Sequence, residues 1–258
     1  MQIGFKHLCI MIAIVIALIL FSSFLCLIVL PSPKEIIESL RSSEMMFSLK
    51  LTLISALIST ILVMIVGTPA AYALARFSFP GKKIIMTILD LPIAMPEVVL
   101  GLALLLLFGK TPLGTFLKYL GIRVVFTKIG VVVAEFFTAL PYAMRTLYST
   151  FETISARYEL VARSLGYGAF ETFMKITLPM ARSGIIAALV IAFARSVGTF
   201  GTVLILAGGT YMVTETLPVT LYLNMSYGNL GMAITSGLLL LGVSFITIYM
   251  VERLGGRT

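Results

Sequence analysis

The residues best suited to specific binding form a polar stretch between two long apolar segments. Its first part reads Tyr158-Glu-Leu-Val-Ala-Arg-Ser-Leu-Gly166, and Ile176-Thr-Leu-Pro179 begins ten residues after that glycine. Leu160, Val161 and Leu165 recur among polar neighbours, and this pattern predicts a short amphipathic helix. A short helix at a membrane surface is suited to docking a partner protein.

A turn and a second helix are expected after this segment. Gly166 and Gly168 can adopt positive φ, so the chain can reverse sharply behind the first helix. A second apolar stripe follows and ends at Pro179, and it consists of Phe170, Phe173, Met174 and Leu178. Acids and bases are mixed in this loop, which favours a protein partner, because a helix lying on lipid would be dense in Lys and Arg.

The residue groups that catalyse reactions within membranes are missing from the sequence. There is no Ser/His pair, no pair of aspartates and no His-Glu-x-x-His motif. Cys9 and Cys26 would sit roughly 25 Å apart on one helix, too far for a disulfide, and the lone His7 has no metal-ligand spacing. Lys110 resembles the end of a phosphate-binding loop, but Leu104 stands where such a loop needs glycine. Any ATP-driven process therefore requires an ATPase on another chain.

The composition is that of a membrane protein. The chain has 258 residues, of which 59% are hydrophobic and 12% charged, and its mean hydropathy is +1.09. A helical span needs roughly 20 apolar residues. We expect one all-α transmembrane domain over residues 1–258, with six spans at about 8–30, 49–74, 84–109, 129–150, 184–208 and 230–250.

The third of these spans has an irregular centre. Asp90, Pro92, Pro96 and Glu97 interrupt it and leave residues 98–108 as its uninterrupted apolar run. Broken backbone at membrane depth is tolerated where it is buried in protein or faces water. The third span is therefore expected to break and to face the interior of the bundle.

The distribution of Lys and Arg predicts that both termini are cytoplasmic. With that orientation the cytoplasmic connections contain eleven: Lys6, Arg76, Lys82, Lys83, Arg145, Arg157, Arg163, Lys175, Arg182, Arg253 and Arg257. The outer connections contain six: Lys34, Arg41, Lys110, Lys118, Arg123 and Lys128. The loop at 151–183 is then cytoplasmic. The net charge of +8 reflects this topology, and its spread over several loops argues against binding of nucleic acid. The first span lacks a cleavage site and is expected to stay in the membrane.

The chain resembles the permeases of ABC importers. Its polar loop matches the EAA loop of that family at Gly166, Ile176, Leu178 and Pro179. Four further stretches are similar to the molybdate, tungstate and sulfate branch, namely residues 91–107, 139–145, 192–201 and 214–222. The resemblance covers nearly the whole chain and implies a type I importer permease fold without catalytic residues.

The same resemblance implies a set of partners. They are a second copy of the permease, two cytoplasmic ABC ATPases that bind ATP and Mg²⁺, and an extracytoplasmic oxyanion-binding protein, all at the plasma (inner) membrane. No metal and no cofactor is expected in this chain. The outer connection Gly209–Asn229 contains no Lys or Arg and is a candidate surface for the binding protein.

The loop residues expected to couple to the ATPase are Glu159, Ala162, Arg163, Ser164, Gly166, Tyr167, Ile176, Leu178 and Pro179. The sequence departs from the family pattern at Leu160, where many relatives have a second glutamate. If that carboxylate normally forms the salt bridge to the ATPase, the contact either comes from Glu159 here or is lost, and we expect Glu159 to supply it.

The residues expected to line the pathway are Pro92, Pro96, Glu97, Glu135, Arg195, Ser196, Gly198, Thr199 and Gly201. Relatives often have Pro in place of Glu97 and Glu in place of Thr199, so an acid is gained in the third span and lost in the fifth. Ionisable groups at membrane depth face the bundle interior and pair. Our hypothesis is that Arg195 pairs with Glu135 or Glu97, and a direct role of Arg195 in binding the ligand is the alternative.

Two other classes of function remain open. An ion-coupled secondary transporter would show an inverted repeat, and residues 1–110 show no convincing similarity to residues 129–250. A structural or sensory subunit would leave the spacing from Gly166 to Pro179 unexplained. Within the importer reading, the sequence leaves molybdate, tungstate and sulfate as alternatives.

Overall fold

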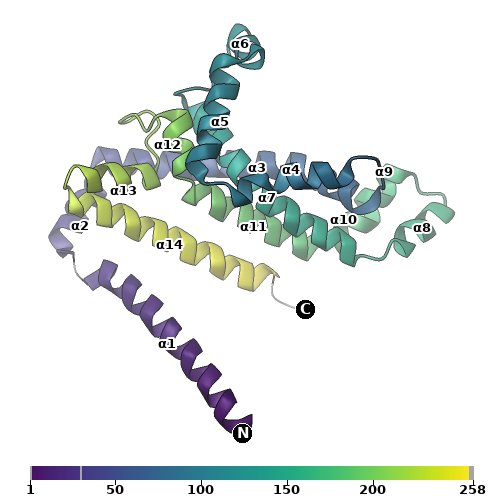
Figure 1. Ribbon diagram of the computed structural model, residues 1–258, viewed down its shortest axis with the longest axis horizontal. Coiled ribbons are helices and arrows are strands. Elements are labelled where there is room, and N and C mark those ends of the chain that lie inside the picture. The colour runs from purple at the N-terminus through teal and green to yellow at the C-terminus, as the bar shows by residue number, and fades with distance from the viewer. Residues whose placement is uncertain (1, 30, 256–258) are drawn as a thin grey trace.

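All regular structure in the described residues, 2–29 and 31–255, is helical in this computed structural model (Figure 1). The elements, in order, are α1 (Gln2–Val29), α2 (Pro33–Arg41), α3 (Ser43–Arg76), α4 (Lys82–Ala94), α5 (Glu97–Lys110), α6 (Pro112–Tyr119), α7 (Lys128–Thr153), α8 (Arg157–Ser164), α9 (Ala169–Thr172), η1 (Phe173–Thr177), α10 (Leu178–Met180), α11 (Arg182–Gly198), α12 (Gly201–Ala207), α13 (Leu217–Ser226) and α14 (Leu230–Gly255). The η1 segment is a turn of π-helix.

Three of the described helices are long and apolar enough to cross a membrane by themselves: Gly4–Val29, Ser43–Arg76 and Leu230–Thr247. Two bent pairs, α4 with α5 and α9–α10 with α11, raise that number to at most five. The expected fourth span lies in the continuous helix α7, whose Glu135 and Arg145 lower its hydropathy. Six spans therefore stay a prediction.

The centre of the bundle is formed by α3, α7 and α11. Val63 and Ala71 of α3 pack with Leu147 and Phe151 of α7, and all four are fully buried. Gly184 of α11 lies so close to α7 that a Cβ there would be 2.0 Å from Oγ1 of Thr150. Small residues at such crossings allow helices to pack tightly where no hydrophobic effect drives them together.

The expected break in the third span is present. The axes of α4 and α5 differ by 118°, and the chain turns at Met95 and Pro96. Figure 1 shows α5 and α6 projecting from the side of the bundle. The fifth span is also broken, because α11 ends at Gly198 and α12 begins at Gly201. Only the first of these breaks was expected from the sequence.

Helix α1 stands apart from the bundle (Figure 1), and none of its most apolar window is buried within the chain. Its exposed side chains include Phe5, Ile12, Leu18 and Phe21. In water such a surface would be strongly unfavourable, whereas hydrocarbon or another apolar helix covers it without cost.

Candidate functional site

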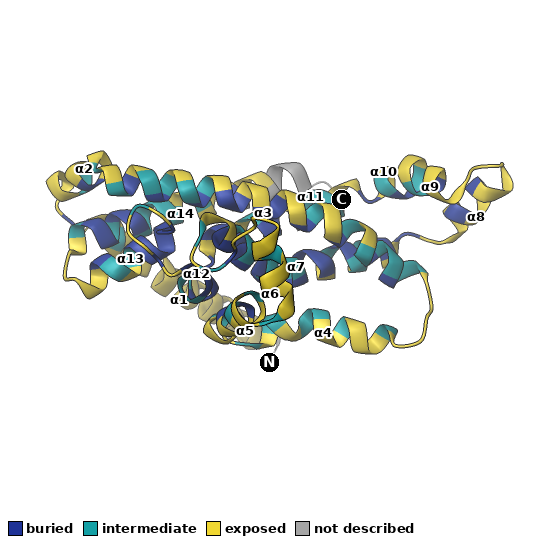
Figure 2. Cartoon of the chain, turned by 90° about the horizontal axis from the view of Figure 1, so that it is seen from above, coloured by how far each residue is buried: buried dark blue, intermediate teal, exposed yellow. Residues whose placement is uncertain are grey.

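The loop between α7 and α11 has the predicted form of helix, glycine turn and helix. Helix α8 ends in a Schellman motif, in which the Tyr167 amide donates to the Ala162 carbonyl (3.2 Å) and the Gly166 amide to the Arg163 carbonyl (3.1 Å). Gly166 has φ +93°, a conformation that glycine adopts without steric cost. Figure 2 shows α8 and α9 beyond one end of the bundle.

The second helix of the loop runs through α9, η1 and α10 and meets α11 at an angle of 77°. Its start is capped by Glu171, whose carboxylate accepts from the Gly168 amide (3.2 Å) and pairs with Lys175 (3.1 Å). The hydrogen bond from Lys175, together with that of Gly168, lowers the pKa of Glu171 below its ordinary value. Pro179 stands just before the bend into α11 and is exposed.

Glu159 has a different position from the one expected. Its residue is only 6% exposed, and its carboxylate forms an ion pair with Arg76 at the end of α3 (Nε to Oε1, 2.8 Å). The hydroxyls of Tyr72 (3.1 Å) and Thr177 (3.0 Å) also donate to it. The expectation that Glu159 itself reaches the ATPase is therefore corrected, because its carboxylate is occupied inside the chain and fastens α8 to α3 and η1.

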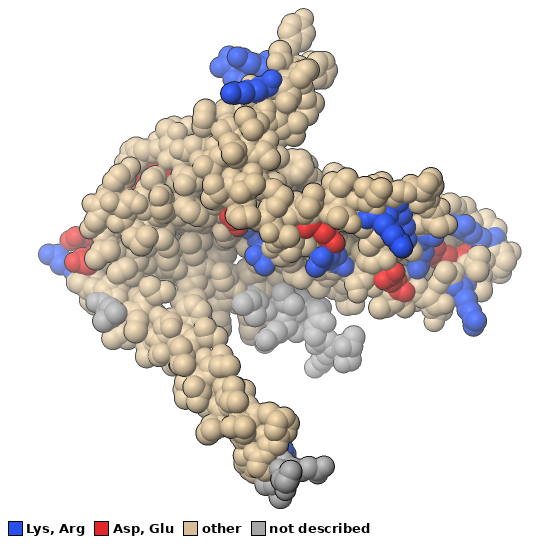
Figure 3. Space-filling model, in the orientation of Figure 1, with Lys and Arg blue, Asp and Glu red and all other residues tan. Residues whose placement is uncertain are grey.

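The outward surface of the loop is mixed in character. Arg163, Ser164, Gly166 and Tyr167 are exposed, while Ala162 is buried and Ile176 and Leu178 are half-buried. A groove of about 640 Å³ lies beside α8, and its lining consists of Ser155, Arg157, Tyr158, Val161, Ala162, Leu165, Tyr167 and Ile176. Figure 3 shows basic and acidic side chains together over this end of the molecule. An apolar groove with a charged rim is typical of a protein interface.

Glu97 joins the two broken spans. Its carboxylate accepts hydrogen bonds from the amides of Phe200 (3.1 Å) and Gly201 (2.9 Å), at the break between α11 and α12. Thr202 donates to the Glu97 carbonyl (3.1 Å). At Gly201 a Cβ would lie 3.0 Å from Cβ of Glu97, so α12 and α5 approach closely there. Glu97, the acid gained in the third span, thus binds the backbone of the fifth span next to Thr199.

Glu135 is buried in the bundle, and no base among the residues that the structure describes forms an ion pair with it. It is 1% exposed, and Ser55 of α3 donates to its Oε1 (2.7 Å). One turn further along α7, Thr138 donates to Thr202 of α12 (3.2 Å). The contact with Ser55 makes Glu135 part of the packing between α3 and α7, and the contact of Thr138 joins α7 to α12.

The hypothesis that Arg195 forms an ion pair with Glu135 or Glu97 is wrong. Its guanidinium lies over the ring of Tyr142, 3.9 Å from the ring centre, and no carboxylate within the described residues is in salt-bridge range. The reason is orientation, because Glu135 faces α3 and Glu97 faces the α12 break. Arg195 itself is exposed.

The remaining pathway residues divide between packing and exposure. Ser196 is buried and donates to Ser59 (3.3 Å), and Thr199 donates back to the Arg195 carbonyl (2.8 Å). Gly201 is buried, whereas Gly198 is exposed. Pro92 is half-buried inside α4, and Pro96 is exposed at the turn before α5.

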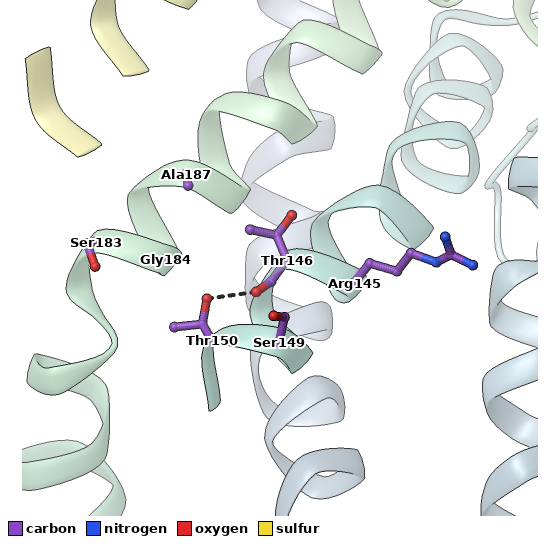
Figure 4. Close-up of a pocket in the computed structure, with 7 residues that line it drawn as sticks. All are labelled: Arg145, Thr146, Ser149, Thr150, Ser183, Gly184 and Ala187. Carbon is purple, nitrogen blue, oxygen red and sulfur yellow. Dashed lines mark hydrogen bonds between the residues drawn. The ribbon is translucent and has the colours of Figure 1, made fainter. Parts of the chain in front are cut away.

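An ion pair that the sequence did not reveal links α4 to α7. Arg145 makes two parallel hydrogen bonds to Asp90, of 2.9 and 3.1 Å, and both side chains are substantially exposed. Next to Arg145, a surface groove of about 530 Å³ lies along the contact between α7 and α11 and is lined mainly by small and hydroxyl residues. Figure 4 shows Thr146, Ser149, Thr150 and Ser183 around this groove, with Arg145 directed away from α11.

An all-helical domain with several candidate membrane spans and a helix–turn–helix loop at one end fits a multi-pass membrane subunit. The particular family follows from comparison with known proteins. Residues 63–258 match the binding-protein-dependent transport system inner membrane components. The chain belongs to this family, and it is accordingly a non-catalytic, multi-pass inner-membrane subunit.

Two relatives illustrate the similarity. The chain is 32% identical over 223 residues to the sulfate transport system permease protein CysW of Synechococcus elongatus, covering 86% of this chain and 78% of that protein. It is 38% identical over 177 residues to the molybdenum transport system permease protein ModB of Mycobacterium bovis, covering 68% of this chain and 67% of that protein.

Solved structures support the fold. A chain of a bacterial alginate ABC transporter, solved with an alginate-bound periplasmic protein, superposes with a TM-score of 0.74 at 16% identity, covering 98% of this chain and 96% of that one. A chain of the MetNI methionine ABC transporter gives 0.63 at 17% identity, covering 83% and 97%. The expected all-helical importer permease fold is thus confirmed.

Proposed function

We propose that this chain is the permease subunit of an ATP-driven importer for a tetrahedral oxyanion, with molybdate or tungstate as the first candidate cargo and sulfate or thiosulfate as the alternative. Two copies enclose the pathway, and each docks one cytoplasmic ABC ATPase that binds ATP and Mg²⁺. An extracytoplasmic binding protein delivers the anion. The named functions of the relatives CysW and ModB support an oxyanion as cargo.

The observation that supports ATP-driven coupling best is the internal attachment of α8. Glu159 fastens this helix to Arg76 and Thr177, so a push on α8 reaches both α3 and η1. Because η1 continues through α10 to the start of α11, the same push reaches a second central helix. Closure of the ATPases would therefore move α3 and α11 together.

The exposed face of the loop supplies the contact with the ATPase. The side chains of Tyr158, Val161 and Leu165 are more than half exposed along one groove, and a partner helix or loop would desolvate them. Arg163 and Ser164 lie beside it and provide polar contacts. Such a groove has apolar anchors in the middle and charge at the rim, as stable protein interfaces do.

A crosslinking experiment tests this function. In a background with Cys9→Ser and Cys26→Ser, we expect Ser164→Cys and Tyr167→Cys to crosslink to a co-expressed ATPase, with a yield that changes when ATP is added. Thr115→Cys, on the projecting helix α6, is the matched control and should not crosslink. If neither loop cysteine captures the ATPase, the proposed function is wrong.

Uptake into proteoliposomes separates the rival mechanisms and cargoes. We expect accumulation of molybdate, tungstate or sulfate to require ATP together with the loaded binding protein. Uptake that an ion gradient drives without ATP would identify a secondary transporter instead. Competition among the three anions at equal concentration of binding protein assigns the cargo.

A further inference from the structure

A face of α7, near the α8 end of the expected fourth span, carries side chains that do not suit lipid. Tyr142, Arg145 and Ser149 are spaced i, i+3 and i+7, so they lie on one side of the helix. Helix α11 runs antiparallel beside it, because Gly184 packs on Thr150 while Arg195 packs on Tyr142. The two helices stay together for about 16 Å, the rise of eleven helical residues.

The charge on this face has to be covered by water or by protein. Arg195 is exposed, and it has no carboxylate partner within the described part of the chain. An arginine at the centre of a lipid-facing helix is unfavourable, so such residues are found facing cavities. The groove further along the same helix pair exposes Ser149 and Ser183, whose hydroxyls also suit water better than lipid.

Arg195 is also pre-organised. Its Cζ lies 3.9 Å from the centre of the Tyr142 ring, which positions the guanidinium, while the residue as a whole is exposed. A guanidinium fork matches two oxygens of a tetrahedral anion. Arg145, by contrast, already has both oxygens of Asp90 as partners, whereas Arg195 has no carboxylate partner among the residues that the structure describes.

We propose that Arg195, held against Tyr142, is a transient binding site for a divalent tetrahedral oxyanion in the pathway, and that the groove between α7 and α11 is its route toward the α8 end. This inference rests on the proposed function. One guanidinium with a few hydroxyl donors holds the anion only weakly, which permits release. Ser149 and Ser183 can donate to the anion along that route, whereas Thr146 and Thr150 already donate to carbonyl groups one turn back.

Thiol labelling in the assembled complex tests the electrostatic part of the proposal. Ser149→Cys, with Cys9 and Cys26 replaced by serine, is treated with anionic and cationic methanethiosulfonate reagents in turn. We expect the anionic reagent to react faster, and Arg195→Gln to lower the anionic-to-cationic rate ratio by about threefold or more, because one unit charge has been removed from the helix pair that forms the groove. Lys83→Gln removes an exposed charge elsewhere and should leave the ratio unchanged. A cysteine that neither reagent reaches, or a ratio that Arg195→Gln leaves unchanged, overturns the proposal.

Uptake of molybdate and sulfate tests the binding part. With saturating loaded binding protein, we expect Arg195→Gln to reduce ATP-driven uptake about tenfold while stimulation of ATP hydrolysis persists, since the lost interaction is a charge-assisted contact with the cargo. Arg195→Lys should fall in between, and Tyr142→Phe should transport better than Tyr142→Leu because it keeps the ring. Normal uptake by Arg195→Gln overturns the proposal and leaves the proposed function standing. A wild-type complex that transports neither anion refutes the proposed function instead.

Discussion

The carboxylate of Glu159 attaches the short helix α8 to α3 and to η1. The EAA-like spacing marks it, but its partners Tyr72 and Arg76 lie more than eighty positions earlier, and Thr177 lies eighteen positions later. Nothing in the local pattern indicates which of these distant groups it meets. The match to a loop motif therefore located the residue, whereas only packing of α3 against the loop shows that its carboxylate faces inward.

Removing this carboxylate should loosen the loop from the bundle. Glu159→Ala leaves Arg76 without its partner in a site where the two side chains are 8% and 10% exposed, and breaking such a buried pair costs about 3–5 kcal/mol. We expect a lower melting temperature of the purified complex and a loss of ATPase stimulation by the binding protein. Glu171→Gln, which breaks the exposed pair with Lys175, is the control and should have a much smaller effect. Equal stability of the two variants would contradict this role.

Glu215 provides a pH-dependent prediction on the opposite end of the molecule. Burial, and secondarily the negative charge of Glu44, raises the pKa of Glu215 above its ordinary value. The folded state then binds more protons than the unfolded state between the two pKa values, so stability falls as the pH rises through that window. We expect Glu215→Gln to melt at a higher temperature than the wild type at pH 7.5, and this advantage to shrink toward pH 4.5. An advantage that is independent of pH would exclude the ionised carboxylate as its cause.

At the scale of elements, glycine and proline residues were the most reliable indicators of where helices end or break. Gly166 predicted the turn after α8, and Pro92 with Pro96 predicted the break in the third span. The break in the fifth span was missed, although Gly198 and Gly201 bracket it. Its apolar composition favours a continuous helix, and the contact that holds the chain open there comes from Glu97, about a hundred residues away.

Two substitutions of Gly166 should distinguish its role in the backbone turn from its role in binding the ATPase. A left-handed conformation costs an ordinary residue about 1–2 kcal/mol, while asparagine tolerates it better. Space is not limiting, because nothing lies within 4 Å of the position of a Cβ. We therefore expect Gly166→Asn to keep the melting temperature of the complex but to weaken ATPase co-purification, and Gly166→Val to lower both. If Gly166→Asn docks normally, the glycine serves the turn alone.

The two breaks should depend on each other through Glu97. Glu97→Ala leaves the amides of Phe200 and Gly201 without their acceptor, and charge-assisted hydrogen bonds are worth about 1.5–3 kcal/mol. We expect lower thermal stability and slower uptake. Adding Thr199→Glu should recover part of the stability, because it supplies α12 with a carboxylate of its own. Circular dichroism melting curves and uptake rates measure the two effects, and an unchanged Glu97→Ala variant would exclude a role for this contact.

At the scale of the whole molecule, the surface divides into one part that suits lipid and one that does not. Helix α1 and the outer side of α3 present apolar residues, as hydrocarbon requires. The faces of α4, α7 and α11 present Asp90, Arg145 and Arg195, which lipid does not accommodate. Hydropathy alone predicted the spans but averaged over these faces, so it gave no indication of which side of each helix is covered.

The charged face predicts the composition of the assembly. A second copy related by a two-fold axis would bring two such faces together around an aqueous path, so that neither meets lipid. We expect native mass spectrometry of the complex with its ATPase to show two copies of this chain and two of the ATPase. A triple variant with Asp90→Leu, Arg145→Leu and Arg195→Leu removes the charges that keep this face away from lipid. It should raise the fraction of single permease chains. A complex that contains one copy of this chain beside a different permease subunit would contradict the homodimer, and the charged face would then be complementary to that other subunit.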